Sequence, residues 1–123
     1  MSSMSENKLI AATYVEDVMC ELRLAPSPKD EVRQPMVRWI SERLLDRLRH
    51  LALAYELPLL ARLPTNGSAT YPEVQLAPIE EELAFLFEVV SDNALLEALS
   101  PVREMLKTAE HDRRGWSLIV ETN

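Results

Sequence analysis

Residues 32–60 read VRQPMVRWISERLLDRLRHLALAYELPLL and contain the longest regular pattern in the chain. Apolar side chains recur there at steps of three and four: Val37, Ile40, Leu44, Leu48, Leu51 and Tyr55. Charged side chains fall on the opposite side at the same spacing: Arg38, Glu42, Asp46 and Arg49. This pattern is typical of an amphipathic helix. We therefore predict one long helix within Val32 to Leu60, running toward Glu56, onto which the shorter segments fold.

The segment before this helix is also predicted to be helical, from about Ser5 to Leu24. Ser5 is a suitable N-cap residue, and apolar residues follow at helical spacing: Ile10, Val15, Val18, Met19 and Leu22. A short strand over Leu9 to Val15 is the rival interpretation. The two prolines in Ala25 to Asp30 should break the chain before the next helix.

The second half begins with the strongest loop signal, Pro64 to Pro72, which we expect to be flexible because it holds Asn66-Gly67. A third helix should start near Ala77-Pro78 and extend to Val90. A short helix should then reach Leu99, and Ser100-Pro101 should start another that ends near Asp112. Gly115 should break that helix, and Trp116 to Val120 should form a strand.

These expectations add up to a mainly α fold: a single-domain bundle of four to five helices with a short C-terminal β-strand. The length of 123 residues suits one domain, with residues 1–4 disordered. A lone strand is not stable by itself. The C-terminal strand should therefore pair either with the N-terminal segment or with another chain.

Composition restricts the function. The net charge of −7 argues against a partner that is nucleic acid or an anionic membrane, because such binding needs a basic surface. The single cysteine, Cys20, excludes an internal disulfide and fits a reducing compartment. The N-terminal residues lack the apolar length of a signal peptide or a membrane span. We expect a cytoplasmic protein.

Residues that could perform chemistry are sparse. His50, His111 and Cys20 form no metal-ligand spacing. His50 follows Asp46 by four residues, which suits a surface ion pair better than a catalytic dyad without a nucleophile. With two glycines in the chain there is no phosphate-binding loop. We expect neither a catalytic residue nor a cofactor or metal.

Charge is unevenly distributed along the chain. Five arginines lie between residues 33 and 49, whereas residues 63–102 contain no lysine or arginine. The acidic second half could pack beside the arginines and be neutralised within the protein. Alternatively, it could present an acidic surface that attracts a basic protein. For that case, the partner-binding candidates are seven acids and aromatics of the second half and one C-terminal tryptophan: Tyr71, Glu73, Glu80, Glu81, Glu88, Asp92, Glu97 and Trp116.

Three stretches of the second half resemble the small, acidic, mainly helical immunity proteins of interbacterial toxin systems. These are Tyr71-Pro72-Glu73-Val74, the segment Ile79 to Val90, and the ending Arg114-Gly115-Trp116-Ser117-Leu118-Ile119-Val120. The resemblance covers about half the chain and includes no diagnostic motif. It implies a protein that binds a toxin tightly and blocks its active site.

We therefore expect a non-catalytic protein-binding module, most specifically an immunity-type inhibitor of a partner toxin. The alternative is an acidic cytoplasmic secretion or assembly chaperone, which would bind an extended client through the C-terminal strand and would form a homodimer. A small enzyme or ligand-binding bundle is the third hypothesis.

Overall fold

A computed structural model describes residues 18–26, 35–111 and 115–122. These residues form four strands, three α-helices and two short 3₁₀ turns. In order, they are β1 (Met19–Ala25), β2 (Met36–Ser41), α2 (Glu42–Ala54), η1 (Leu60–Arg62), β3 (Ser68–Tyr71), η2 (Glu73–Gln75), α3 (Leu76–Val89), α4 (Asn93–His111) and β4 (Ser117–Glu121).

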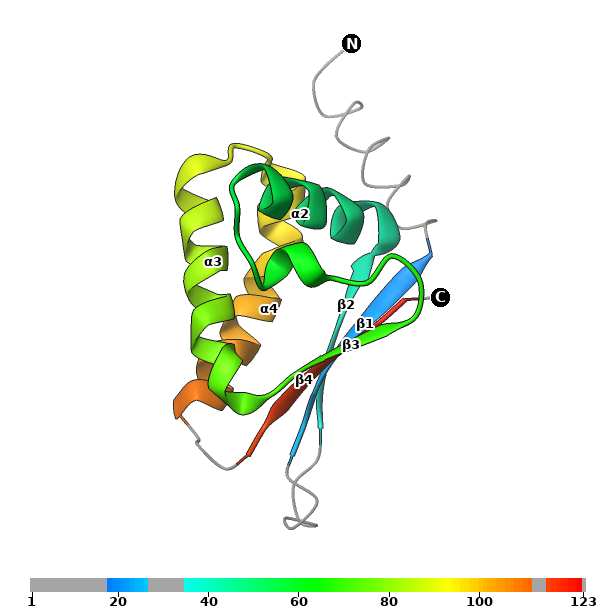
Figure 1. Cartoon of the computed structure of the whole chain (residues 1–123), viewed down its shortest axis with the longest axis vertical. Helices are drawn as coiled ribbons and strands as arrows, with labels where there is room; N and C mark the ends of the chain where they lie inside the picture. The colour runs from blue at the N-terminus through cyan, green and yellow to red at the C-terminus, as the bar shows by residue number, and fades with distance from the viewer. Residues whose placement is uncertain (1–17, 27–34, 112–114, 123) are drawn as a thin grey trace.

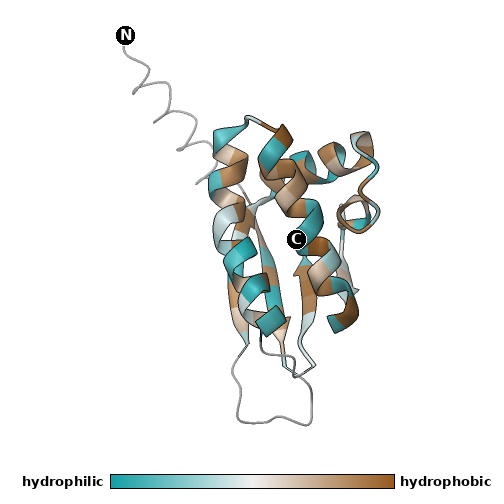
Figure 2. Cartoon of the chain, turned by 90° about the vertical axis from the view of Figure 1, so that its left-hand side faces the viewer, coloured by the Kyte–Doolittle hydropathy of each residue, from teal (hydrophilic) through white to brown (hydrophobic). Residues whose placement is uncertain are grey.

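The four strands form one antiparallel sheet in the order β2-β1-β4-β3. The two central strands come from opposite ends of the described chain, and Leu22 of β1 lies opposite Val120 of β4. All three helices lie on one face of the sheet (Figure 1). Alternate residues of β1 and β4 are buried against those helices. Figure 2 marks the apolar residues of the strands and helices in brown. The apolar core therefore lies between one sheet and one helical layer.

The predicted helical bundle is wrong, because the fold is α+β. The predicted long helix is a strand and a helix joined end to end at Ser41. The Ser41 side chain accepts a hydrogen bond from the Leu44 N–H over 3.2 Å, which caps α2. Ile40 lies at the end of β2, opposite Cys20, and is buried by the same core as the apolar side of α2. The apolar residues of β2 therefore happen to continue the spacing of those on α2, although the backbone of β2 is extended.

The N-terminal prediction is also corrected. Residues 19–25 alternate strictly, with Cys20, Leu22 and Leu24 buried and Glu21 and Arg23 on the opposite face. This period of two is typical of a strand. The last part of the predicted Ser5 to Leu24 helix is therefore the strand β1. The rest of that helix, the rival strand at Leu9 to Val15 and residues 1–4 lie outside the described residues.

The second half agrees better with the prediction. The helix expected up to Val90 is confirmed as α3, and the C-terminal strand is confirmed as β4. The partners of β4 are β1 and β3 of the same chain. The strand β3 forms inside the expected loop at residues 64–72. The two expected helices around Ser100-Pro101 are a single helix, α4, with Pro101 in its interior.

Candidate protein-binding surface

Tyr71 and Trp116 are core residues. Both side chains are buried, with relative exposures of 1% and 4%. The Tyr71 hydroxyl donates a hydrogen bond to the Leu59 carbonyl over 2.9 Å. Burial raises the pKa of Tyr71 to about 12, and the Arg62 guanidinium and the Glu82 carboxylate make smaller, opposed contributions. Neither aromatic ring is presented to a partner in this structure.

Three of the candidate acids have partners within the protein. Arg103 donates to Glu80 Oε1 over 2.7 Å and also stacks on the Phe87 ring, 4.6 Å from its centroid. Glu73 accepts a hydrogen bond from the Gly115 N–H. Glu80 therefore links α3 to α4, and Glu73 links η2 to the residues just before β4.

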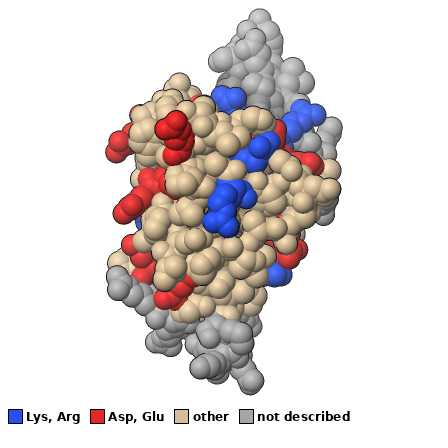
Figure 3. Space-filling model, viewed as in Figure 1, with Lys and Arg blue, Asp and Glu red and all other residues tan. Residues whose placement is uncertain are grey.

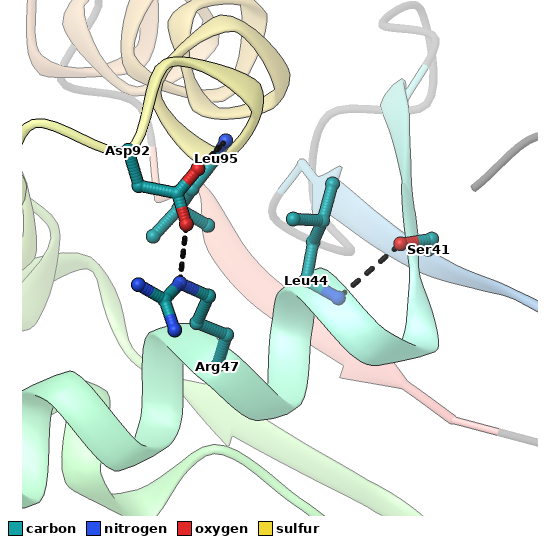
Figure 4. A network of polar contacts seen from close by, with 5 residues as sticks. All are labelled: Ser41, Leu44, Arg47, Asp92 and Leu95. Carbon is teal, nitrogen blue, oxygen red and sulfur yellow. Dashed lines mark hydrogen bonds and ion pairs between the residues drawn. The ribbon is translucent and has the colours of Figure 1, made fainter. Parts of the chain in front are cut away.

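Asp92 is the third engaged acid, and it has two functions (Figure 4). Its Oδ1 accepts from the Leu95 N–H over 3.2 Å and caps α4. Its Oδ2 forms an ion pair with Arg47 of α2. The acidic half therefore does contact the arginine-rich helix. Among the described residues, Asp92 is the candidate acid that makes this contact.

The other candidate acids point to solvent. Glu81, Glu88 and Glu97 are exposed and have no ion pair or hydrogen-bonded side chain among the described residues. Glu81 and Glu88 lie on the outer side of α3, and Figure 3 shows acidic side chains along the side of the molecule that α3 forms. Glu97 lies on α4. Only part of the predicted acidic set therefore forms a free acidic surface.

An apolar patch adjoins Glu81 and Glu88. It consists of Tyr55, Phe85 and Val89, whose relative exposures are 43%, 38% and 45%. The Tyr55 and Phe85 rings meet edge to face, with centroids 5.4 Å apart and an interplanar angle of 76°. On α3, Phe85 lies four residues from Glu81 and Val89 and three from Glu88, so these side chains are neighbours on one helix face. We call these five residues the α3 patch.

The position of Tyr55 beside α3 depends on Glu82. Its two carboxylate oxygens accept from the backbone N–H groups of Leu59 and Leu60, over 3.1 and 2.9 Å. These bonds fasten the segment after α2 to α3. Nothing in the sequence around Glu82 indicates so distant a partner.

Tyr55, Phe85 and Val89 were also missed as surface residues. A signal for two of them exists in the sequence: residues 83–90 contain more apolar side chains than one helix face can bury. The structure buries Leu83 and Leu86 and leaves Phe85 and Val89 on the outside. Tyr55 could not be found in this way, because its place depends on where α2 ends.

His50, Asp46 and Arg49 form a polar cluster on the surface of α2. His50 Nδ1 lies 2.8 Å from the Asp46 carbonyl oxygen and 3.3 Å from Asp46 Oδ2. Arg49 donates to the other Asp46 carboxylate oxygen over 2.7 Å. Within the described ranges, no three His, Cys, Asp or Glu side chains are grouped so as to hold a metal ion. In the same ranges, no helix has both the length and the apolar character that crossing a bilayer requires.

Comparison of the chain with protein-family models, with curated proteins and with solved structures finds no match.

Proposed function

We propose that this protein is a non-catalytic protein-binding module that holds a basic protein on its α3 patch, and most specifically that it is an immunity-type inhibitor of a toxin. The observation that supports this proposal is the α3 patch. In it, exposed Tyr55, Phe85 and Val89 lie beside two carboxylates that form no ion pair with any described residue. A partner that covers the exposed apolar side chains removes them from water. If that partner is basic, its charges are also attracted by the neighbouring carboxylates.

The two parts of the patch have different roles in binding. Aromatic side chains supply most of the affinity of an interface when they are covered, and truncating one often costs about 2 kcal/mol or more. Uncompensated carboxylates at the rim raise the association rate and select basic partners, at a smaller cost in affinity. The ring of Phe85 is the central anchor, because Tyr55, Glu81, Glu88 and Val89 all adjoin it.

The proposed partner is a toxin whose surface or active site is basic. An inhibitor of such a site needs a stable acidic face rather than a catalytic group. The overall charge of −7 extends the attraction beyond the patch itself. The cytoplasm remains the proposed location.

The chaperone alternative has lost the feature that favoured it. The C-terminal strand was expected to pair with the backbone of a client. In the structure β4 has β1 on one side and β3 on the other, so both of its edges are occupied.

The proposal is tested by capturing partners from a lysate of the native host on immobilised protein, followed by kinetic measurements with the purified partner. Phe85→Ala should weaken binding at least tenfold, mainly through faster dissociation. The double variant Glu81→Gln/Glu88→Gln should slow association, and the difference from wild type should shrink in high salt. Glu97→Gln is the matched control, since Glu97 is an exposed acid on another helix and forms no ion pair within the described ranges.

The immunity role makes a further requirement of that partner. Expression of the partner alone should arrest growth, and co-expression of this protein should restore it, whereas the Phe85→Ala variant should restore it poorly. Binding that is equally strong for wild type and Phe85→Ala would exclude the α3 patch. A partner that binds the patch but does not arrest growth would support the protein-binding function and exclude the immunity role.

A further inference from the structure

A surface recess of about 240 Å³ lies where the beginning of α3 meets the end of α4. The residues that line it are Glu73, Val74, Leu76, Ala77, Ala109 and Glu110. A water molecule takes about 30 Å³ of liquid volume, so the recess has room for a long side chain. The α3 patch does not include any of these residues.

The lining of the recess selects one class of ligand. Among the residues that the structure describes, it combines four apolar residues with two carboxylates, and none of its lining side chains is cationic. An anion would be repelled by the carboxylates. A wholly apolar ligand would remove water from those carboxylates without replacing it. A cation on an apolar stem satisfies both parts, as in the side chains of lysine and arginine.

Both carboxylates have acceptor capacity left. Glu73 Oε2 accepts the Gly115 N–H, which leaves the second oxygen of that carboxylate. The Glu110 side chain has no hydrogen bond or ion pair among the described residues. The apolar wall is open to water, since Val74 is 81% exposed. A ligand that covers Val74 therefore removes apolar surface from water at the same time as it meets a charge.

The position of the recess connects it with the α3 patch. Ala77 lies eight residues before Phe85 on α3, and a helix rises 1.5 Å per residue, so the two are about 12 Å apart along the helix. Ala77, Glu81, Phe85 and Glu88 follow one another at steps of three and four. A single partner that covers the patch can therefore reach the recess along one face of α3.

We infer that this recess receives a lysine or arginine side chain of the basic partner, an inference that rests on the proposed function. The aliphatic stem lies against Val74 and Ala77, and the cation lies between Glu73 and Glu110. Arginine suits the site better than lysine, because its guanidinium is less strongly hydrated and can donate to two carboxylates at once. The partner is then anchored at two points, one aromatic and one cationic.

The inference is tested without the partner, by NMR titration of the full chain with n-butylguanidinium chloride. The probe has the stem and the charge of an arginine side chain. It should cause saturable shifts of the Val74, Ala77 and Glu110 amides, with a dissociation constant on the order of millimolar. Guanidinium chloride supplies the charge alone and n-butanol the stem alone, so each should bind at least about threefold more weakly.

Two variants and one control assign the binding to the recess. Glu110→Gln should weaken binding of the probe about threefold to tenfold, because it removes one of the two charges. Ala77→Leu should abolish binding by filling the space. Glu104→Gln should leave it unchanged, since Glu104 is an exposed acid of α4 outside the recess. If the probe causes no saturable shift, or if Glu110→Gln and Glu104→Gln behave alike, the inference is overturned.

The partner experiment separates this inference from the proposed function. With the captured partner, Glu110→Gln should raise the dissociation rate by at least about threefold while Phe85→Ala retains its larger effect. Normal binding by Glu110→Gln together with loss in Phe85→Ala would reject the recess and keep the α3 patch. Probe binding at the recess without any partner dependent on Phe85 would reject the proposed function alone.

Discussion

Tyr71 has a hydroxyl that must stay protonated for the fold to be stable. Its pKa is raised to about 12 by burial, whereas an unfolded tyrosine titrates near 10. The folded pKa is the higher one, so the stabilising effect of the neutral hydroxyl is complete below pH 10 and is lost as the pH rises through 12. We predict that the free energy of unfolding falls between pH 10 and pH 12 by roughly 2 kcal/mol through this group, as measured by urea titration at each pH.

The matched variant is Tyr71→Phe. At pH 7 it should cost about 1 kcal/mol, because the Leu59 carbonyl loses its hydrogen-bond donor. Above pH 10 it should lose less stability than wild type, and the two curves should converge. Parallel curves from pH 8 to pH 12 would show that the pKa of Tyr71 does not differ between the folded and unfolded states.

Glu56 is the non-glycine residue with a positive φ, 58°, in the described chain. It follows α2, where the Leu57 N–H bonds to the Ala52 carbonyl over 2.8 Å and closes the helix end. Glycine is favoured at this position because a side chain is strained there. We predict that Glu56→Gly stabilises the protein by about 0.5–1 kcal/mol, measured by thermal and urea unfolding.

Glu97→Gly is the control: the same substitution should lower the stability there rather than raise it. Glu97 is an exposed acid in the interior of α4, where glycine costs about 1 kcal/mol. A loss of stability in both variants would mean that the Glu56 carboxylate stabilises the fold more than its backbone strain destabilises it.

At the scale of elements, the sequence predicted α3 and β4 well but failed for residues 19–41. The alternation of Cys20, Leu22 and Leu24 was visible, but Val18, Met19 and Leu22 also fit a helical spacing. A window of seven residues satisfies both periods, and pairing with β2 and β4 decides between them. Propensity cannot supply that information, because the partner strand β4 lies about 95 residues further along the chain.

Pro101 misled the helix prediction in the opposite direction. Ser100-Pro101 reads as a helix start, yet Ser100 donates from its side chain to the Leu96 carbonyl over 3.3 Å and the helix continues. Asp92 caps the helix eight residues earlier than Ser100. Leu95, Leu99, Val102 and Leu106 are buried in one core, and this tertiary packing outweighs the hydrogen bond that the proline removes.

Asp92 therefore controls both the start of α4 and its contact with α2. We predict that Asp92→Asn costs less than about 1 kcal/mol, because asparagine retains the capping oxygen and loses only an exposed ion pair with Arg47. Asp92→Ala should cost about 1 kcal/mol more, since the Leu95 N–H then loses its acceptor. The measurement is urea unfolding at low and high salt.

Salt separates the two contributions of Asp92. The cost of Asp92→Asn should shrink in 1 M NaCl, whereas the additional cost of alanine should remain. Equal destabilisation by the two substitutions would show that the cap contributes little and that the ion pair is the main link between α2 and α4.

At the scale of the whole molecule, the surface could be predicted less well than the core. Seven of the acids and aromatics in the predicted binding set share one stretch of sequence, but the fold distributes them among different tasks. Asp92 and Glu80 join helices, Tyr71 enters the core, and Glu81 and Glu88 remain outside. Exposure and pairing depend on which elements meet, so charge counting along the chain found the acidic half without finding the patch.

The sheet order also makes the molecule one cooperative unit. The central strand β4 joins β1 to β3, and its Leu118 and Val120 are buried with leucines of all three helices. Trp116, directly before β4, is buried in the same core, whereas Trp39 on β2 is 56% exposed. The chain should therefore have no stable form in which the helices persist after β4 has separated.

The two tryptophans allow a direct test. In Trp39→Phe the remaining Trp116 reports on β4, and the substitution should cost less than about 0.5 kcal/mol because Trp39 is exposed. We predict that the red shift of Trp116 emission and the loss of helical circular dichroism have the same urea midpoint and slope. Trp116→Phe is the control, in which Trp39 emission should change little on unfolding. A Trp116 transition at lower urea than the helical one would mean that β4 leaves the sheet first and that the helices form a separate unit.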